Sequence, residues 1–432
     1  MNYYSTNQQS PKASFREAAI KGQPPDKGLY FPERIPILDA GLLQDIKRLS
    51  REEIALEIIR PYTGDSIPGT VLKDIIAQTI NFEFPLVQVE EDVYSLELFH
   101  GPTLAFKDVG ARFMSRCLEY FARNNDHKMV VLTATSGDTG GAVADGFYKT
   151  DGIEVVILYP SGKVSSVQEL QLTRLGHNIH ALEVNGSFDD CQRLVKQAFA
   201  DRPLNEAISL TSANSINIAR WLPQQFYYFF ALQQWPHAHS PVISVPSGNF
   251  GNLCAGLLAY RSGLPVQHFV AACNANDAVP QYFQTGKYQP KQSIATISNA
   301  MDVGDPSNFV RVLELFQSDS GHLQEIISTY SISDEHTKLA IGEVFHKNGY
   351  VMDPHGAVAY ASLKKYLQQH PGMKGIFLET AHPVKFRDLV EQLTGKTIDV
   401  PASIARLLNK EKRATRINAD YRALEEYLLN NV

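Results

Sequence analysis

From about residue 93, short apolar stretches alternate with loops and with segments of helical periodicity. The stretches that read as strands lie at 129–134, 154–159, 179–184, 242–246, 268–273 and 375–379. Helical segments lie between most of them, and such crossover connections are what parallel strands require. The alternation therefore predicts an α/β fold with a mainly parallel sheet covered on both faces. Residues 1–90 instead alternate amphipathic helices with turns and include a short strand at 28–32.

Size and composition exclude several classes of protein. The 432 residues allow two or three domains, and the net charge of −6 gives no general attraction to nucleic acid or to an anionic membrane. No apolar stretch approaches the ~18 residues of a membrane span, and the N-terminus lacks the pattern of a secretory signal. The four cysteines form no CxxC pair, so neither a metal site nor a disulfide framework is indicated. We expect a reduced, cytoplasmic protein without a metal.

Lys107 is the candidate catalytic residue. It lies in the run LFHGPTLAFKD (98–108), where a strand-like stretch at 94–99 gives way to a helix with Phe113, Cys117, Leu118 and Phe121 along one face. This placement points the amine toward a strand end, where open α/β sheets bind their ligands. A partly desolvated amine there has a lowered pKa and can form a Schiff base with an aldehyde cofactor. The alternative is a solvated surface lysine, which is the ordinary state of an isolated lysine.

Two strand-to-helix junctions share one design. They read VVLTATSGDTGGAVA (130–144) and VISVPSGNFGNLCAG (242–256). In each, a small-residue loop opens a helix whose unpaired N–H groups can bind an anion. Neither is a nucleotide-binding fingerprint, because GxGxxG and GxxxxGK[ST] are absent. One such loop could simply be a tight turn, but two of them beside a positioned lysine favour two anionic groups, such as a cofactor phosphate and a substrate carboxylate.

Other polar residues follow strands or begin helices. Lys163 follows one strand, and the run NSINIAR (214–220) can present Ser, Asn and Arg within two helical turns. Taken alone, Lys163 and Arg220 are more often solvated than functional. After the last strand, Thr380 is placed where its hydroxyl could meet a ring nitrogen. His382 precedes a proline in a turn, which is more often a structural position than that of a general base.

The matching segments together resemble the threonine synthase family, in its bacterial and fungal branch, among the fold-type II pyridoxal-phosphate enzymes. They run in order along nearly the whole chain: GLYFP (28–32), LELFHGPTLAFKD (96–108), LTATSGDTGGAVA (132–144), TSANSINIAR (211–220), VPSGNFGN (245–252), NAMDVGDPSNF (299–309), DPHGAVAY (353–360) and LETAHPVKF (378–386). The combination is more specific than the lysine motif and GNFGN alone. Gly141, Gly146 and Glu379 depart from the usual family pattern.

The resemblance implies two open, mostly parallel α/β domains with an N-terminal mixed helical extension. The expected boundaries are 1–92 for the extension, 93–220 for a smaller domain carrying the lysine and the substrate-carboxylate loop, and 221–432 for a larger domain with the cofactor-phosphate loop and a helical tail. It also implies a monomer and a closing movement of the smaller domain.

The resemblance further implies a role for each candidate residue. Lys107 forms the Schiff base with pyridoxal 5′-phosphate. The residues expected to hold the cofactor are Phe106, Asp138, Gly248, Asn249, Phe250, Gly251, Asn252 and Thr380. The residues expected to bind the substrate carboxylate lie in the first loop and include Thr135, Ser136, Gly137 and Thr139. The candidates for the substrate phosphate are Lys163, Ser215, Asn217 and Arg220.

The implied reaction converts O-phospho-L-homoserine and water to L-threonine and phosphate. Two other functions remain open on the sequence. One is a related enzyme with the same cofactor, a phospholyase or a hydroxy-amino-acid dehydratase. The other is a non-catalytic regulator that binds pyridoxal phosphate or an amino acid. The intact lysine, both loops and Thr380 argue against the regulator, because a protein that only binds needs no Schiff base.

Overall fold

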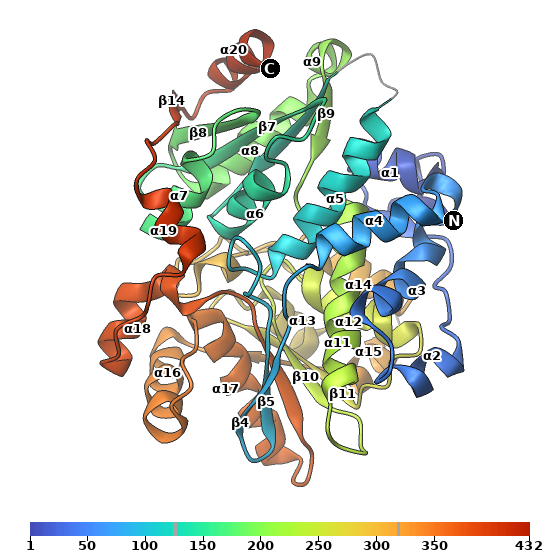
Figure 1. The fold of residues 1–432 in the computed structure, drawn as a ribbon, viewed down its shortest axis with the longest axis vertical. Helices are drawn as coiled ribbons and strands as arrows, with labels where there is room; N and C mark the ends of the chain where they lie inside the picture. The colour runs from blue at the N-terminus through green and yellow to red at the C-terminus, as the bar shows by residue number, and fades with distance from the viewer. Residues whose placement is uncertain (124–127, 318–319) are drawn as a thin grey trace.

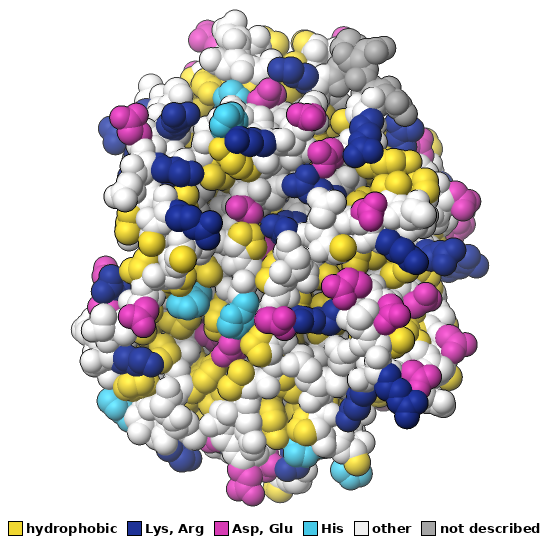
Figure 2. All heavy atoms as spheres, viewed as in Figure 1, with side chains coloured by type: hydrophobic (Ala, Val, Ile, Leu, Met, Phe, Trp, Pro, Cys, Tyr) yellow, Lys and Arg dark blue, Asp and Glu magenta, His cyan; other side chains and the backbone are white. Residues whose placement is uncertain are grey.

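The computed structural model describes residues 1–123, 128–317 and 320–432. The chain forms two lobes, each built on its own sheet, with a helical N-terminal segment packed beside them (Figure 1). Among the described residues, no helix is both long and apolar enough to cross a bilayer. On the face drawn in Figure 2, acidic and basic side chains are interspersed over both lobes.

The larger lobe contains a six-stranded sheet. Its strands are β4 (Leu86–Glu90), β5 (Val93–Glu97), β10 (Val242–Pro246), β11 (His268–Cys273), β12 (Ile327–Ser331) and β13 (Gly375–Glu379). Their order is β12-β11-β10-β13-β5-β4. Every neighbouring pair is parallel except β4 and β5, which form an antiparallel hairpin at one edge.

The smaller lobe contains a five-stranded sheet that is parallel throughout. Its strands are β6 (Met129–Ala134), β7 (Ile153–Pro160), β8 (Ile179–Asn185), β9 (Ser209–Ser212) and β14 (Thr415–Asn418), in the order β14-β8-β7-β6-β9. Both faces of this sheet are covered, because successive residues of β7 enter different cores. Val155 and Ile157 belong to the main core, whereas Val156 and Leu158 pack in a second core with residues of a helix at 188–200.

The helices of the N-terminal and smaller-lobe parts of the chain are α1 (Phe15–Lys21), α2 (Ala40–Asp45), α3 (Arg51–Thr63), η1 (Gly64–Ser66), α4 (Gly69–Thr79), α5 (Lys107–Ala122), α6 (Asp138–Gly146), α7 (Ser166–Thr173), α8 (Phe188–Ala200), α9 (Arg202–Ala207), α10 (Ile218–Trp221) and η2 (Leu222–Gln225). The helices that follow are α11 (Phe226–Gln234), α12 (Gly251–Arg261), α13 (Ala278–Thr285), η3 (Asn299–Met301), α14 (Phe309–Leu315), α15 (Ser320–Ile326), α16 (Asp334–Asn348), α17 (Pro354–Gln369), η4 (Pro383–Phe386), α18 (Arg387–Thr394), α19 (Ala402–Leu408) and α20 (Tyr421–Asn431). A small antiparallel sheet of β1 (Asn2–Ser5), β2 (Ala13–Ser14) and β3 (Tyr30–Pro32) completes the N-terminal segment.

The predicted α/β class and its parallel sheets are confirmed, and the strands predicted at 129–134, 242–246, 268–273 and 375–379 have these bounds in the structure. The prediction missed β9 and β12, whose sequences SLTS and ISTYS are too polar to read as core strands. Sheet membership also differs from the predicted boundaries. β4 and β5 belong to the larger sheet, and β14 returns from the C-terminal part of the chain to pair with β8 of the smaller one.

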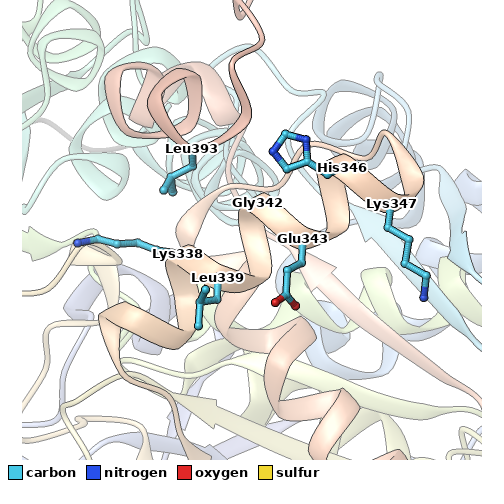
Figure 3. Close-up of a pocket in the computed structure, with 7 residues that line it drawn as sticks. All are labelled: Lys338, Leu339, Gly342, Glu343, His346, Lys347 and Leu393. Carbon is cyan, nitrogen blue, oxygen red and sulfur yellow. The ribbon is translucent and has the colours of Figure 1, made fainter.

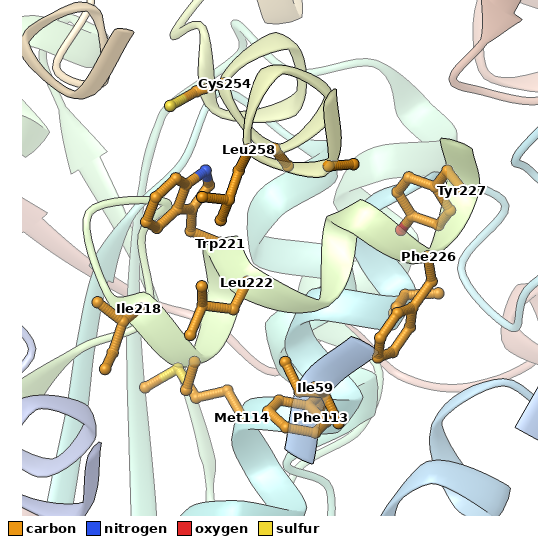
Figure 4. Close-up of a cluster of buried hydrophobic side chains, with 14 of the residues drawn as sticks. Ile59, Phe113, Met114, Ile218, Trp221, Leu222, Phe226, Tyr227, Cys254 and Leu258 are labelled. Carbon is orange, nitrogen blue, oxygen red and sulfur yellow. The ribbon is translucent and has the colours of Figure 1, made fainter. Parts of the chain in front are cut away.

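An aromatic and aliphatic cluster joins the N-terminal segment to the two lobes (Figure 4). Trp221 and Leu222 lie at its centre and connect Phe113 of α5 with Leu258 of α12 and Ile59 of α3. Burying each of these side chains contributes about 1.5–3 kcal/mol to folding. The start of α5, which carries Lys107, is therefore held by a packed core.

Arg311 is a buried cation that forms hydrogen bonds both with the N-terminal segment and with the segment around Ser215. Its guanidinium donates to the carbonyl oxygens of Tyr30 at 3.0 Å, Ser215 at 3.1 Å and Ile216 at 2.6 Å. It also lies 4.4 Å from the ring centroid of Trp221. In the part of the chain that the structure describes, Arg311 forms no ion pair, so carbonyl dipoles and the indole face stabilise its charge.

Replacing Arg311 with alanine should lower the free energy of unfolding by about 3 kcal/mol or more, because several buried carbonyl oxygens lose their donor. Urea denaturation monitored by circular dichroism measures this change. Arg202→Ala, which removes an exposed i,i+4 pair with Glu206, is the matched control and should change stability by less than ~0.5 kcal/mol. Equal stabilities of the two variants would contradict the role given to Arg311.

Candidate active site

Lys107 is the first residue of α5, as its position after a turn predicted. The turn before it is fixed to the end of β13 by backbone bonds. Phe106 N–H donates to the carbonyl oxygen of Thr380 at 2.9 Å, and Ala105 forms an isolated bridge with Ala381. The hydroxyl of Tyr227 donates to the carbonyl oxygen of Phe106. The structure therefore brings Lys107, Phe106 and Thr380 together at the carboxyl end of β13.

The Lys107 amine lies in a desolvated and largely cationic environment. Burial is the main cause that lowers its pKa to about 8, and the nearby charges of Lys385 and Arg220 lower it further, while Asp138 opposes the shift. An amine with this pKa is partly neutral at physiological pH. The neutral form is the one that attacks an aldehyde or accepts a proton.

The first predicted anion loop closes around the hydroxyl of Thr135. That hydroxyl accepts hydrogen bonds from the N–H groups of Gly137 at 2.9 Å and Gly140 at 2.8 Å. Gly137 has φ +138°, and a Cβ there would collide with the side chain of Gln168, so only glycine fits this close approach. Ser136 and Thr139 are half-buried on the same loop. Helix α6 begins at Asp138, so the last residues of this segment form its first turn.

Asp138, the first residue of α6, forms a buried ion pair with Lys385. The Nζ of Lys385 lies 2.7 Å from Asp138 Oδ1, and Gln168 Nε2 donates to the same oxygen at 3.0 Å. Burial alone would raise the pKa of Asp138, but the positive charges of Lys385 and Lys107 outweigh burial and hold that pKa below its usual value. Asp138 is therefore ionised at neutral pH.

Lys385 is the residue that sequence analysis missed. It lies in η4, just after β13, with its side chain 0% exposed. The available signal was a lysine between Val384 and Phe386, an apolar setting in which a buried lysine needs a partner charge.

The second predicted anion loop precedes α12 and forms a cradle of backbone N–H groups. Phe250 takes a left-handed conformation with φ +60° at the helix start. Within the described residues, the N–H groups of Gly248, Phe250, Gly251 and Asn252 have no protein acceptor, and the buried Nδ2 of Asn252 also lacks a partner. The loop thus has unused donors suited to an anion such as a phosphate.

The cradle is held from two sides. Asn249 donates from Nδ2 to Ser215 Oγ at 2.9 Å and accepts at Oδ1 from Ser307 N–H at 2.6 Å. A Cβ on Gly248 would lie 2.6 Å from the Cα of Met301, so backbone passes directly against the loop. These contacts fix the donors before any ligand binds, which reduces the cost of binding.

The four candidates for the substrate phosphate do not gather in one place. Lys163 lies in an exposed turn after β7, and Ser215 contacts the second loop through Asn249. The side chain of Asn217 is used within the protein. Its Oδ1 caps α10 by accepting from Ala219 N–H, and its Nδ2 donates to the carbonyl oxygen of Ala19. Arg220 is buried, its Nη1 donates to the carbonyl oxygen of Ala213, and its Nε has no partner among the described residues. Of the four, Arg220 is the one whose charge lowers the pKa of Lys107.

Residues at the end of β13 differ in their exposure and bonding. Thr380 is 6% exposed, and no protein partner of its hydroxyl is found among the described residues. His382 accepts from Val384 N–H at 3.0 Å through Nδ1 and caps η4, which is the structural position expected for it. Glu379 is fully buried, and burial together with the neighbouring Asp353 raises its pKa well above the usual value.

The two glycines that depart from the family pattern lie on α6. A Cβ on Gly146 would lie 3.1 Å from the backbone of Ala111, so the glycine lets α6 approach α5 closely. A Cβ on Gly141 would lie 3.2 Å from the side-chain oxygen of Gln171, a tight contact with a group that can move. Neither departure alters a predicted ligand-binding atom.

A separate open groove lies on the outside of the larger lobe, between α16 and α18 (Figure 3). It is lined by Lys338, Leu339, Gly342, Glu343, His346, Lys347 and Leu393. None of these is a predicted site residue, and the groove has no converging set of polar groups of the kind found around Lys107.

Comparisons with known proteins decide the family. Residues 80–377 match the family described as pyridoxal-phosphate dependent enzyme, residues 2–80 match threonine synthase N terminus, and residues 356–428 match threonine synthase, C-terminal. The chain is 43% identical over 433 residues to the threonine synthase of Escherichia coli, covering 100% of both chains. The chain belongs to the threonine synthase family. The predicted fold type and the predicted cofactor, pyridoxal phosphate, are thereby confirmed.

Solved structures agree with this membership. The crystal structure of threonine synthase from E. coli superposes with a TM-score of 0.94 at 43% identity and covers 100% of both chains. The structure of pyridoxal-phosphate-bound threonine synthase from Brucella melitensis superposes with a TM-score of 0.91 at 34% identity and covers 99% of both chains. The unused N–H donors of the second loop and the desolvated Lys107 fit the phosphate and the aldehyde of that cofactor.

Gly248→Ala should weaken pyridoxal-phosphate binding about tenfold or more, because the added methyl group pushes the loop away from the Met301 backbone. Fluorescence titration of the full-length protein after removal of its cofactor measures the dissociation constant. Gly69→Ala, where a Cβ meets no atom within 4 Å, is the control and should bind as the unchanged protein does. Equal affinities would show that the 248–252 loop does not hold the phosphate.

Proposed function

We propose that this protein converts O-phospho-L-homoserine and water to L-threonine and phosphate, the last step of threonine biosynthesis. The observation that carries the proposal is the full-length match, in which segments specific to threonine synthases flank the general pyridoxal-phosphate core. The four free, buried cysteines suit the reduced cytoplasm, where we place the protein. We also propose that it acts as a monomer, which sedimentation velocity tests.

The residues of the second loop would hold the cofactor phosphate through their free N–H groups, and Thr380 would face the pyridine nitrogen. When bound, pyridoxal phosphate supplies an electron sink for the negative charge left on substrate carbons. Because Thr380 offers a neutral hydroxyl instead of a carboxylate, it does not favour a protonated ring nitrogen. Phe106, half-buried beside Lys107, would pack against the ring.

Lys107 has two tasks in this proposal. Its amine would hold the aldehyde of the cofactor covalently until the amine of the substrate displaced it. The freed amine then removes the Cα proton and carries protons at Cβ and Cγ. Phosphate leaves from Cγ, and water adds at Cβ. An amine whose pKa is lowered to about 8 can both accept and return protons near neutral pH.

The 135–140 loop would bind the substrate carboxylate, and Arg220 is the strongest of the four candidates for the substrate phosphate. Lys163 is exposed, and the side chains of Ser215 and Asn217 bond to other parts of the protein. The pocket must admit water only after phosphate has left. A closing movement of the smaller lobe, which carries the 135–140 loop, would provide this control.

The decisive test is incubation of the holoenzyme with O-phospho-L-homoserine, followed by measurement of threonine and free phosphate. Equal amounts of both support the proposal. Formation of 2-oxobutyrate and ammonia instead would identify a phospholyase or dehydratase. Bound cofactor without any turnover would identify a regulator.

Lys107→Ala should reduce kcat by about 10²-fold to 10⁴-fold or more and remove the absorbance of covalently held cofactor, because both the anchor and the base are lost. The rate of phosphate release measures kcat, and an absorbance spectrum measures the covalently held cofactor. Lys374→Met removes a lysine from an exposed ion pair with Asp92 and should retain both properties. A Lys107→Ala enzyme that kept normal turnover would disprove the assignment.

Arg220→Lys should raise KM for O-phospho-L-homoserine about tenfold or more while the cofactor spectrum is retained, because lysine keeps the charge but loses the planar fork. Arg220→Ala should raise KM further. Steady-state kinetics with varied substrate measures both. Unchanged KM in both variants would remove Arg220 from the phosphate site.

A further inference from the structure

The Lys385–Asp138 ion pair crosses between the lobes. Lys385 lies in η4, directly after β13 of the larger sheet, whereas Asp138 begins α6 in the smaller lobe. The Nζ–Oδ1 distance is 2.7 Å, with 0% and 4% of the two side chains exposed. A charge pair this well buried is costly unless it is completed by further bonds, and Gln168 supplies one at 3.0 Å.

Several elements contribute charged or titratable groups to the surroundings of Lys107. Arg220 on α10 and Lys385 on η4 are cations, and Asp138 on α6 is an anion. Asp108 on α5 is bonded to Thr103, and burial raises the pKa of its carboxyl to about 7. His355 on α17 acts on Asp138, and Tyr227 on α11 is neutral because burial raises its pKa. Asp138 is thus the negative charge that raises the pKa of the lysine amine.

One anion is therefore shared by two lysines. The structure shows direct contact of Asp138 with Lys385, while Lys107 interacts with Asp138 through space. If Lys385 were absent, Lys107 would be the remaining lysine partner of a buried carboxylate. The carboxylate would then hold Lys107 as an ammonium, which is a poor base and cannot attack an aldehyde.

We propose that Lys385 is a positioning residue for the reaction, because it binds Asp138 and so keeps that carboxylate from capturing the Lys107 amine. Lys385 thereby leaves Lys107 free to act as a neutral amine when the substrate displaces it. Its contact with α6 also holds the start of the 135–140 loop in register with the end of β13. The proposal rests on the proposed function in taking Lys107 as the reacting amine.

The proposal requires opposite effects from the two partners of the pair. Lys385→Met removes a positive charge and leaves Asp138 to Lys107, so the pKa of Lys107 should rise by about one unit or more. Asp138→Asn removes the attracting carboxylate, so the same pKa should fall. Lys385→Arg keeps the charge and should stay close to the unchanged protein. The unmodified Lys107 should titrate near the value of about 8 that burial produces.

Competitive labelling measures this titration without turnover. Full-length protein freed of cofactor is treated with a trace of acetic anhydride between pH 6 and 11, and acetylation of the Lys107 peptide is quantified by mass spectrometry. Lys374→Met serves as the matched control, since its exposed pair with Asp92 is remote in the fold and should leave the midpoint unmoved. The pH titration of the bound cofactor's absorbance gives a second readout in the holoenzyme.

The outcomes separate this proposal from a purely structural role. The proposal is supported if the midpoint of the Lys107 titration rises in Lys385→Met and falls in Asp138→Asn, each relative to the unchanged protein. A Lys385→Met protein that loses stability or kcat while the midpoint stays fixed, or moves down, overturns it. If Lys385→Met does not fold, an Asp138→Asn midpoint that fails to fall overturns it equally. Absence of threonine formation by the unmodified enzyme would instead refute the proposed function and leave these midpoints measurable.

Discussion

The pairing of β5 with β13 is the constraint on which the site depends. The two strands run in register from Val93 opposite Gly375 to Glu97 opposite Glu379. Where the pairing ends, the chain after each strand continues the contact, and Phe106 N–H meets the carbonyl oxygen of Thr380 at 2.9 Å. A slip of one residue would turn every side chain of the strand to the opposite face. The register therefore determines that Lys107 and Thr380 meet at the carboxyl ends of these strands.

Burial, more than the number of charged groups, determines how strongly the charges of the site interact. Arg220, Lys107 and Lys385 lie close together with one ionised carboxylate, Asp138, among them. Buried cations without an equal number of anions repel one another, because the low dielectric strengthens that repulsion. The same excess becomes favourable when a substrate carboxylate, a substrate phosphate and a cofactor phosphate enter. The excess of positive charge and the N–H groups without a protein acceptor among the described residues thus suit this site to anionic ligands.

Local patterns predicted much of this molecule, and the failures have a common physical cause. The strand at 242–246 and the loop after it were readable because an apolar run stops at small residues. Lys385 was missed because its significance depends on Asp138, a residue 247 positions away in sequence. Asn217 was read as a ligand, yet its amide is used by Ala19 in the N-terminal segment. A polar side chain in a sequence does not reveal whether its partner is a ligand or a distant backbone group.

The ion pair between the lobes also bears on how water reaches the substrate. The proposed reaction needs water at Cβ at one step and must exclude it before, which is why a closing movement of the smaller lobe was proposed. Lys385 and Asp138 connect the two lobes, and both side chains are out of solvent. Breaking the pair during opening would expose two charges in a poorly hydrated place, which costs several kcal/mol. We therefore expect the proposed closing movement to leave this ion pair intact.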